Sequence, residues 1–196
     1  MFNGNDLQLL RSELFGREAT EPSHNWDDDI ANQSPPVIAV RRIRIAMTSV
    51  ILSFQFTYVR EDGTLYVGPR YGDFGTTFNL VTIDLALDEC IVQVSGLVTD
   101  TGSPVMISFS TLTSAGKATT YGPYGSDFGG GSTSFNVDGI ILGFFGTHKI
   151  TGTSIQGIGF DYLTLDLPTS APMMGPTNEG QFNLKGGEWH ACMHGY

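Results

Sequence analysis

One glycine-rich segment occurs twice in this chain. Tyr-Val-Gly-Pro-Arg-Tyr-Gly-Asp-Phe-Gly at residues 66–75 is matched by Tyr-Gly-Pro-Tyr-Gly-Ser-Asp-Phe-Gly at residues 121–129, and each copy lies between two runs of alternating apolar and polar residues. Glycine adopts backbone angles that a residue with a Cβ resists, and Gly-Pro is typical of a turn, so we expect a strand to end at each copy. The repeat predicts one β unit used more than once, and the spacing fits a Greek key of short strands.

Period-two alternation predicts strands through the middle of the chain. Leu52, Phe54, Phe56 and Tyr58 alternate with more polar neighbours, which is typical of a strand with one buried face. The other expected strands cover residues 37–45, 78–87, 90–97, 105–111, 139–146 and 155–167, with turn signals at Asp-Gly (62–63) and Asp-Thr-Gly-Ser (100–103). Since no helical crossover separates them, we predict an all-β fold of antiparallel sheets joined by hairpins and Greek keys.

The two ends of the chain differ from this pattern. Leu7, Leu10 and Leu14 have helical spacing, which predicts a helix over residues 6–15 that stops at Gly16. Beyond Pro168 the chain is rich in proline and glycine and shows no periodicity. We therefore predict a helical extension (1–15), one domain (16–168) and a C-terminal tail (169–196).

Composition excludes several classes of partner. The formal net charge is -10, whereas nucleic-acid binding depends on cationic side chains that release counterions from phosphates. No stretch approaches the roughly 20 apolar residues of a membrane span, and no basic amphipathic segment suits an anionic membrane surface. The first ten residues lack the basic start and apolar run of a signal peptide, so we expect a cytoplasmic location.

Adjacent carboxylates at Asp27, Asp28 and Asp29 invite a metal interpretation. Calcium loops alternate their ligands and include a glycine, so we expect instead a solvated turn whose aspartates bind nearby backbone amides. Trp26, just before them, is expected to anchor this segment on the domain. We predict no metal site and no cofactor.

The chain also lacks a recognisable catalytic pattern. It contains no nucleophile elbow and no metal-ligand helix, and Asp161 and Asp166 are typical of solvated strand positions rather than of an acid and base pair. Its cysteines, Cys90 and Cys192, are expected to be free thiols. His190 and His194 flank Cys192 without the fourth ligand that a structural zinc site needs.

An ordered set of motifs resembles the jacalin-related lectin family. The motifs are Trp-Asp-Asp (26–28), Leu-Ser-Phe-Gln-Phe-Thr-Tyr (52–58), Glu-Cys-Ile-Val-Gln-Val-Ser-Gly (89–96), Tyr-Gly-Pro-Tyr-Gly (121–125), Gly-Phe-Phe-Gly (143–146) and Ile-Gly (158–159). They follow the family's order between residues 16 and 168. The resemblance implies the β-prism I fold, with three four-stranded Greek-key sheets around a pseudo-threefold axis, and non-enzymatic binding of mannose-, glucose- or galactose-type glycans.

The resemblance also implies where a sugar would bind. In this family the pocket lies at one end of the prism, between an N-terminal glycine loop, a Gly-x-x-x-Asp loop before the last strand and, in some members, the loop ahead of Tyr-Gly-Pro. Carried onto this sequence, the carbohydrate-binding residues are Gly16, Gly116, Lys117, Gly152, Thr153, Ser154, Ile155 and Gln156. Gln156 replaces the family's aspartate, and its amide oxygen has less acceptor capacity than a carboxylate. The family's second site would align with residues 46–50, which have neither the glycine nor the aspartate.

Two functions remain open at this point. The first is a lectin module that binds glycans through residues 152–156, with new contacts from His148 and Lys149 of a longer loop. The second is a β-prism that has lost sugar binding and serves as a structural or protein-interaction module. In either case the terminal extensions are candidate surfaces for a partner protein or for a second copy of the chain. A fold shared with lectins supports the first function by analogy.

Overall fold

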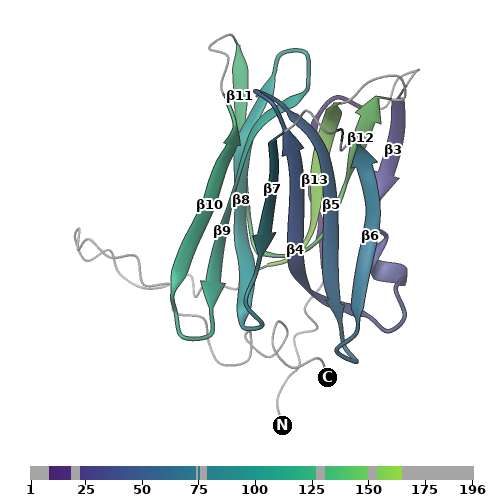
Figure 1. Cartoon of the computed structure of the whole chain (residues 1–196), viewed down its shortest axis with the longest axis vertical. Helices are drawn as coiled ribbons and strands as arrows, with labels where there is room; N and C mark the ends of the chain where they lie inside the picture. The colour runs from purple at the N-terminus through teal and green to yellow at the C-terminus, as the bar shows by residue number, and fades with distance from the viewer. Residues whose placement is uncertain are drawn as a thin grey trace, which may run out of the picture.

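A computed structural model describes residues 9–18, 23–73, 75, 79–126, 131–149 and 154–164, and these form an all-β structure (Figure 1). Within these ranges, one 3-10 turn, η1 (Ile30–Asn32), is the only helical element, and no helix is long and apolar enough to cross a membrane. The strands are β1 (Leu9–Arg11), β2 (Phe15–Gly16), β3 (Ser23–Asp27), β4 (Val37–Met47), β5 (Ile51–Arg60), β6 (Leu65–Gly72), β7 (Asn79–Asp84), β8 (Glu89–Thr99), β9 (Pro104–Thr113), β10 (Ala118–Gly125), β11 (Ser132–Asp138), β12 (Ile140–Lys149) and β13 (Ile155–Leu163).

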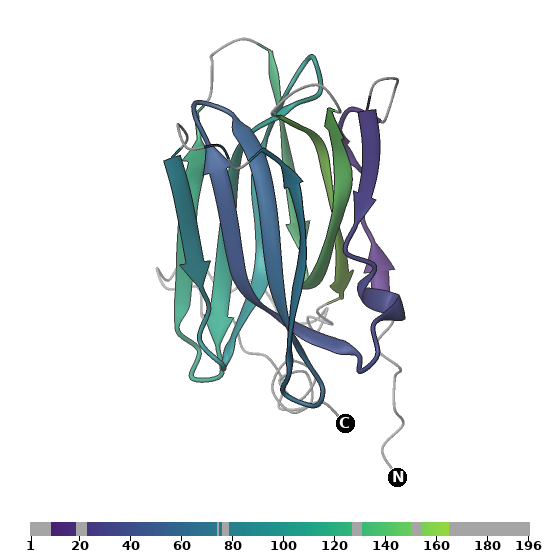
Figure 2. The same cartoon turned by 45° about the vertical axis from the view of Figure 1, so that its right-hand side comes forward.

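The strands form three antiparallel sheets with one shared plan. A hairpin lies at the centre of each sheet, and an outer strand pairs with each arm of the hairpin. The orders are β6-β5-β4-β7, β10-β9-β8-β11 and β1-β13-β12-β3, where β2 also pairs with β13 as the second half of one interrupted edge. The sheets stand around a common interior (Figure 2). This arrangement confirms the predicted prism of three Greek-key sheets.

Three glycines with positive φ occupy equivalent places in the three sheets. Gly16 (φ 118°), Gly72 (φ 82°) and Gly125 (φ 88°) each end an edge strand that pairs with the second arm of the central hairpin. A Cβ at any of them would overlap a carbonyl oxygen of that arm, so the close approach of the two strands requires glycine. The carbonyl oxygens belong to Gln156, Leu52 and Val105.

In both copies of the repeated segment, the Gly-Pro pair lies inside a strand rather than in a turn. Gly68 and Pro69 lie within β6, and Gly122 and Pro123 lie within β10. The pairing register shifts at both places, which marks a bulge in each outer strand. Proline cannot donate to a ladder but is tolerated on a sheet edge or at a bulge. The expectation that the strands end at Gly-Pro is therefore wrong, and the repeat itself is confirmed.

The helix predicted over residues 6–15 is wrong in its described part. β1 pairs with the end of β13, and β2 pairs with its beginning. A short helix has little stability alone, and the open edge of β13 offers backbone partners that outweigh the helical spacing of the leucines. The predicted tail over residues 169–196 lies outside the described residues.

Aromatic side chains from all three sheets meet in the interior. Phe56 of β5 stacks on Phe144 of β12 with ring centroids 3.8 Å apart. Phe109 of β9 and Phe160 of β13 make T-shaped contacts with Phe144, with ring centroids 6.5 and 5.7 Å away. All four are fully buried. Trp26 is buried against Tyr71 at 4.2 Å, which confirms its role as an anchor.

Cys90 lies in the same core, where it is disulfide-bonded. The expectation of free thiols is therefore wrong for Cys90, because spacing along a sequence does not reveal which thiols meet in the fold. Cys192, with His190 and His194, lies outside the described residues.

Candidate functional site

The predicted N-terminal glycine and the predicted Gln156 meet at one end of the prism. Gly16 pairs with Gly157, and the amide of Arg17 donates a 2.8 Å hydrogen bond to the carbonyl of Gln156. The Thr147 hydroxyl donates to the carbonyl of Arg17 at 2.6 Å. The main chain of residues 16–17 is thus held against the two strands that flank the predicted sugar-binding loop.

A third segment, the turn between β8 and β9, reaches the same place. A Cβ at Gly16 would lie 2.5 Å from the carbonyl oxygen of Gly102, and a Cβ at Gly102 would lie 2.7 Å from Cβ of Arg17. The turn closes on itself, because Gly102 donates to the Thr99 carbonyl at 2.7 Å and Ser103 donates to the Thr99 hydroxyl at 3.1 Å. The sequence identified this segment as a turn, but nothing in it indicated proximity to Gly16.

Gly116 and Lys117 lie at the opposite end of the prism. They form the turn between β9 and β10, where the Gly116 amide donates to the Thr113 carbonyl at 2.9 Å (Figure 1, bottom). The ten residues of β9 separate this turn from the one beside Gly16, a distance of about 30 Å at the rise of a strand. The structure therefore does not bring these two predicted site residues to Gly16 and Gln156.

The predicted loop is described from Ser154 onward, and Gly152 and Thr153 lie outside the described residues. Ser154 and Gln156 are half-buried, whereas Ile155 is fully buried in the core. Ile155 can thus serve a ligand only through its backbone. The Ser154 carbonyl accepts a 3.3 Å hydrogen bond from the Lys149 amide, which closes the hairpin between β12 and β13.

His24 and His148 face each other beside this hairpin. They are cross-strand partners on β3 and β12, with ring centroids 5.9 Å apart. Burial, and then the proximity of His24, lower the pKa of His148, so its imidazole is neutral at pH 7. Nδ1 of His148 is buried and has no hydrogen-bond partner among the described residues, so a ligand can meet this ring only at Nε2. His148 and Lys149 are the last two residues of β12, and their contact with a ligand stays a prediction.

The turn that corresponds to the family's second site is closed. Between β4 and β5, Thr48 donates to the Val50 carbonyl at 3.0 Å. Ser126 donates two hydrogen bonds to the Ser49 carbonyl, from its amide at 3.0 Å and from its hydroxyl at 3.2 Å. Residues 46–50 therefore lack the family's glycine and aspartate, and they form a tight turn in which the Ser49 carbonyl already accepts hydrogen bonds.

The three adjacent aspartates have different environments. Oδ1 of Asp27 accepts a 2.8 Å hydrogen bond from the Asp29 amide, as expected for a turn. Asp28, in contrast, is buried and accepts hydrogen bonds from Tyr58 and Tyr71, so the prediction of a wholly solvated turn is wrong. In the described part of the chain, no three His, Cys, Asp or Glu side chains are grouped to hold a metal ion.

Asp161 is also buried, contrary to the expectation of a solvated strand residue. Its side chain is 4% exposed and pairs with Arg11 of β1 at 2.8 Å. The sequence did not indicate this partner, because β1 was expected to be helical. Asp166 lies outside the described residues.

Comparisons with known proteins agree with this fold. The family model for the jacalin-like lectin domain matches residues 13–161. The chain is 34% identical to the agglutinin alpha chain of Artocarpus integer over 55% of this chain and 81% of that protein, and 35% identical to a galactose-specific lectin of Morus indica over 57% and 68%. A mannose-specific jacalin-related lectin from Morus nigra, solved in complex with mannose, has a TM-score of 0.60 at 26% identity and covers 84% of this chain and 99% of its own. The chain therefore belongs to the jacalin-like lectin domain family, whose members are non-enzymatic.

Proposed function

We propose that this protein binds neutral glycans of the mannose, glucose or galactose type at the end of the prism formed by residues 16–17, 99–103 and 154–156. Binding involves no chemical change in the sugar. The relatives support the sugar class, since one is described as galactose-specific and another as mannose-specific and in complex with mannose. A cytoplasmic location and a second copy bound through the terminal extensions remain predictions.

The observation that carries the proposal is the contact between Gly16, Arg17 and Gln156. Gly16 leaves no room for a Cβ beside the Gln156 carbonyl, and the Arg17 amide already donates to that carbonyl. Both backbones are thereby fixed before any ligand arrives, which lowers the ordering cost of binding. Fixed main-chain groups beside a half-buried polar side chain suit sugar hydroxyls, which both donate and accept.

Gln156 sets the expected strength of binding. A carboxylate at this position would accept charge-assisted hydrogen bonds, which are roughly twice as strong as neutral ones. Replacing it by a neutral amide costs about 1 to 3 kcal/mol, which lowers the affinity by about 5- to 150-fold. We therefore expect weak binding of single sugars.

An NMR titration with methyl α-mannoside and methyl β-galactoside tests the proposal. We expect dose-dependent shifts of the Arg17, Ser154 and Gln156 amides at millimolar sugar, and none at Lys117, which lies at the other end of the prism. If neither sugar nor a broader glycan panel moves these amides, the glycan proposal fails. The presence of glutamine at position 156 would then favour the alternative, a prism that serves as a protein-interaction module.

A further inference from the structure

A cavity of about 350 Å³ lies on the sheet that carries Gln156, between β1 and β3. This volume falls in the range of about 300 to 1,000 Å³ that is typical of small-molecule sites. Glycines of β13 allow other side chains to pack directly on the backbone of the sheet here. A Cβ at Gly159 would overlap the Phe145 ring, and one at Gly157 would meet Leu14. The lining includes Arg11, Leu14, Asn25, Asp27, Phe145 and Thr147.

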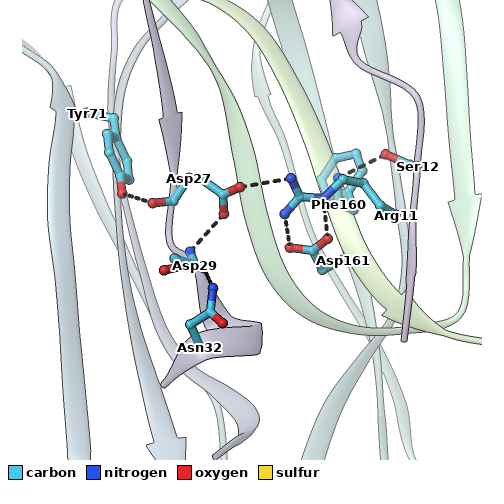
Figure 3. Close-up of polar contacts among 8 residues, drawn as sticks. All are labelled: Arg11, Ser12, Asp27, Asp29, Asn32, Tyr71, Phe160 and Asp161. Atoms are coloured by element: carbon cyan, nitrogen blue, oxygen red, sulfur yellow. Dashed lines mark hydrogen bonds and ion pairs between the residues drawn. The ribbon is translucent and has the colours of Figure 1, made fainter. Parts of the chain in front are cut away.

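Arg11 lines the cavity, and its guanidinium is held by two contacts to Asp161 and one to Asp27 (Figure 3). Its Nε and Nη2 donate to the two oxygens of Asp161 at 2.8 and 3.0 Å, and its Nη1 lies 2.8 Å from Oδ2 of Asp27. The guanidinium also lies 4.4 Å from the centre of the Phe145 ring. Arg11 and Asp27 keep 50% and 38% of their side-chain surfaces exposed, so both reach a ligand without rearrangement.

The charges of Arg11, Asp27 and Asp161 indicate which class of ligand the cavity can bind. One guanidinium faces two carboxylates, so an anion meets a net negative charge, and a cation competes with Arg11 for carboxylates that are already paired. Asp27 retains acceptor capacity, because a carboxylate has about four lone-pair sites and, among the described residues, its side chain accepts from two partners, the Asp29 amide and Arg11. Leu14 and Phe145 add apolar surface. A neutral ring with hydroxyl groups and an apolar C–H face, such as a sugar unit, matches all of these features.

The cavity adjoins the site at residues 16–17 and 154–156. Thr147 lines the cavity and donates to the Arg17 carbonyl, while the Arg17 amide donates to Gln156. Along β12, Thr147 is two residues from Lys149, or about 7 Å at the rise of a strand. The Lys149 amide in turn donates to the carbonyl of Ser154, the first described residue of the predicted loop. A ligand of two or three sugar units can therefore extend from the loop into the cavity.

We propose that this cavity is a second saccharide subsite, which makes the preferred ligand an oligosaccharide rather than a single sugar. The inference rests on the proposed function, because the first unit of the oligosaccharide occupies the loop. Asn25 and Asp27 of β3 and Arg11 of β1 contact the additional unit.

The test compares single sugars with trisaccharides by calorimetry and NMR. We expect mannotriose, or a galactose-containing trisaccharide, to bind about tenfold more tightly than the corresponding methyl glycoside. Asn25→Trp, which fills the cavity, removes this advantage and leaves binding of the methyl glycoside unchanged. Ser134→Trp is the matched control, because Ser134 is also exposed on an outer strand but belongs to another sheet, and it should alter neither affinity.

A readout in the unmodified protein keeps the test independent of any variant's folding. The side-chain amide resonances of Asn25 should shift with the trisaccharide and not with the methyl glycoside. Trisaccharides that bind no more tightly than single sugars, or that leave Asn25 unmoved, overturn the second subsite while the proposed function stands. So does an equal loss of both affinities in Asn25→Trp. Failure of every saccharide to bind the unmodified protein overturns the proposed function and the subsite together.

Discussion

The hydroxyl of Tyr71 donates a 2.9 Å hydrogen bond to Oδ1 of the buried Asp28. Tyr58 donates to the other carboxylate oxygen, and a Cβ at Gly68 would lie 2.8 Å from Oδ1, so the site is closed on that side. Burial raises the pKa of Asp28 to about 7, although both tyrosine hydrogen bonds act in the opposite direction. The carboxyl group is therefore largely protonated in the folded protein below neutral pH.

Stability should consequently fall as the pH rises from about 4 to about 7. The folded-state pKa lies above the ordinary value of 3.8, so folding favours the protonated carboxyl. The stabilising contribution is complete below pH 4 and is lost as the pH passes through the folded-state pKa, by about 4 kcal/mol in total. Urea denaturation of the protein and of Asp28→Asn at several pH values measures the difference.

Tyr71→Phe provides the control for this assignment. It removes one hydrogen bond that lowers the folded-state pKa of Asp28, so the pH range over which stability is lost should extend further upward, while its lower end near pH 4 stays the same. A stability difference between the protein and Asp28→Asn that does not change between pH 4 and pH 7 would contradict a raised pKa.

Gly16→Ala should destabilise the protein by about 2 to 4 kcal/mol, because it adds backbone strain to an overlap with the carbonyl of Gln156. Gly116→Ala is the matched control: its φ is also positive at 78°, but nothing lies within 4 Å of its Cβ position, so a loss of about 1 kcal/mol is expected. Equal losses in chemical denaturation would show that the contact at Gly16 is unimportant.

Arg11→Met should lower the free energy of unfolding by about 1 to 3 kcal/mol, because it leaves the buried carboxylate of Asp161 without its partner. Arg42→Met breaks a pair with Asp84 in which both side chains are about half exposed, and should cost less than about 1 kcal/mol. Adding Asp161→Asn to Arg11→Met should recover part of the loss. A similar cost for the two arginines would exclude a special role for the buried carboxylate.

Gln156→Asp should strengthen binding of a methyl hexoside by about tenfold, since a carboxylate accepts stronger hydrogen bonds from sugar hydroxyls. Lys117→Ala should leave binding unchanged, because Lys117 is on the turn at the far end of β9. Calorimetric titration measures both variants. Unchanged or weaker binding by Gln156→Asp would mean that the loop binds its ligand through other groups.

Most of the fold could be predicted from alternation and from the repeated Gly-Pro segment. The central strands, for example the one that contains Phe54 and Phe56, have one fully buried face, and this burial produces the period-two pattern. The edge at β1 and β2 was missed because its strands are only three and two residues long, too short for any period to be visible. Its pairing depends on β13, about 150 residues away.

The candidate site could be predicted only in part. The resemblance to the lectin family identified Gly16 and Gln156, and the structure brings their backbones together. The turn containing Gly102 belongs to a different hairpin, and only the three-sheet arrangement places it beside Gly16. The role of Arg11 could not be predicted either, because its partner Asp161 lies about 150 residues away in the sequence and only the folded sheet brings the two together.

The pairing of Leu9 with Leu163 affects the order in which the protein can fold during synthesis. The third sheet takes its outer strands from residues 9–27 and its central hairpin from residues 140–163. A nascent chain can complete the sheets built on β4–β5 and β8–β9 during synthesis. Residues 9–27, in contrast, stay without their sheet partners until β12 and β13 have emerged from the ribosome. Contacts between such distant segments slow folding, so closure of this last sheet should limit the rate at which the prism forms.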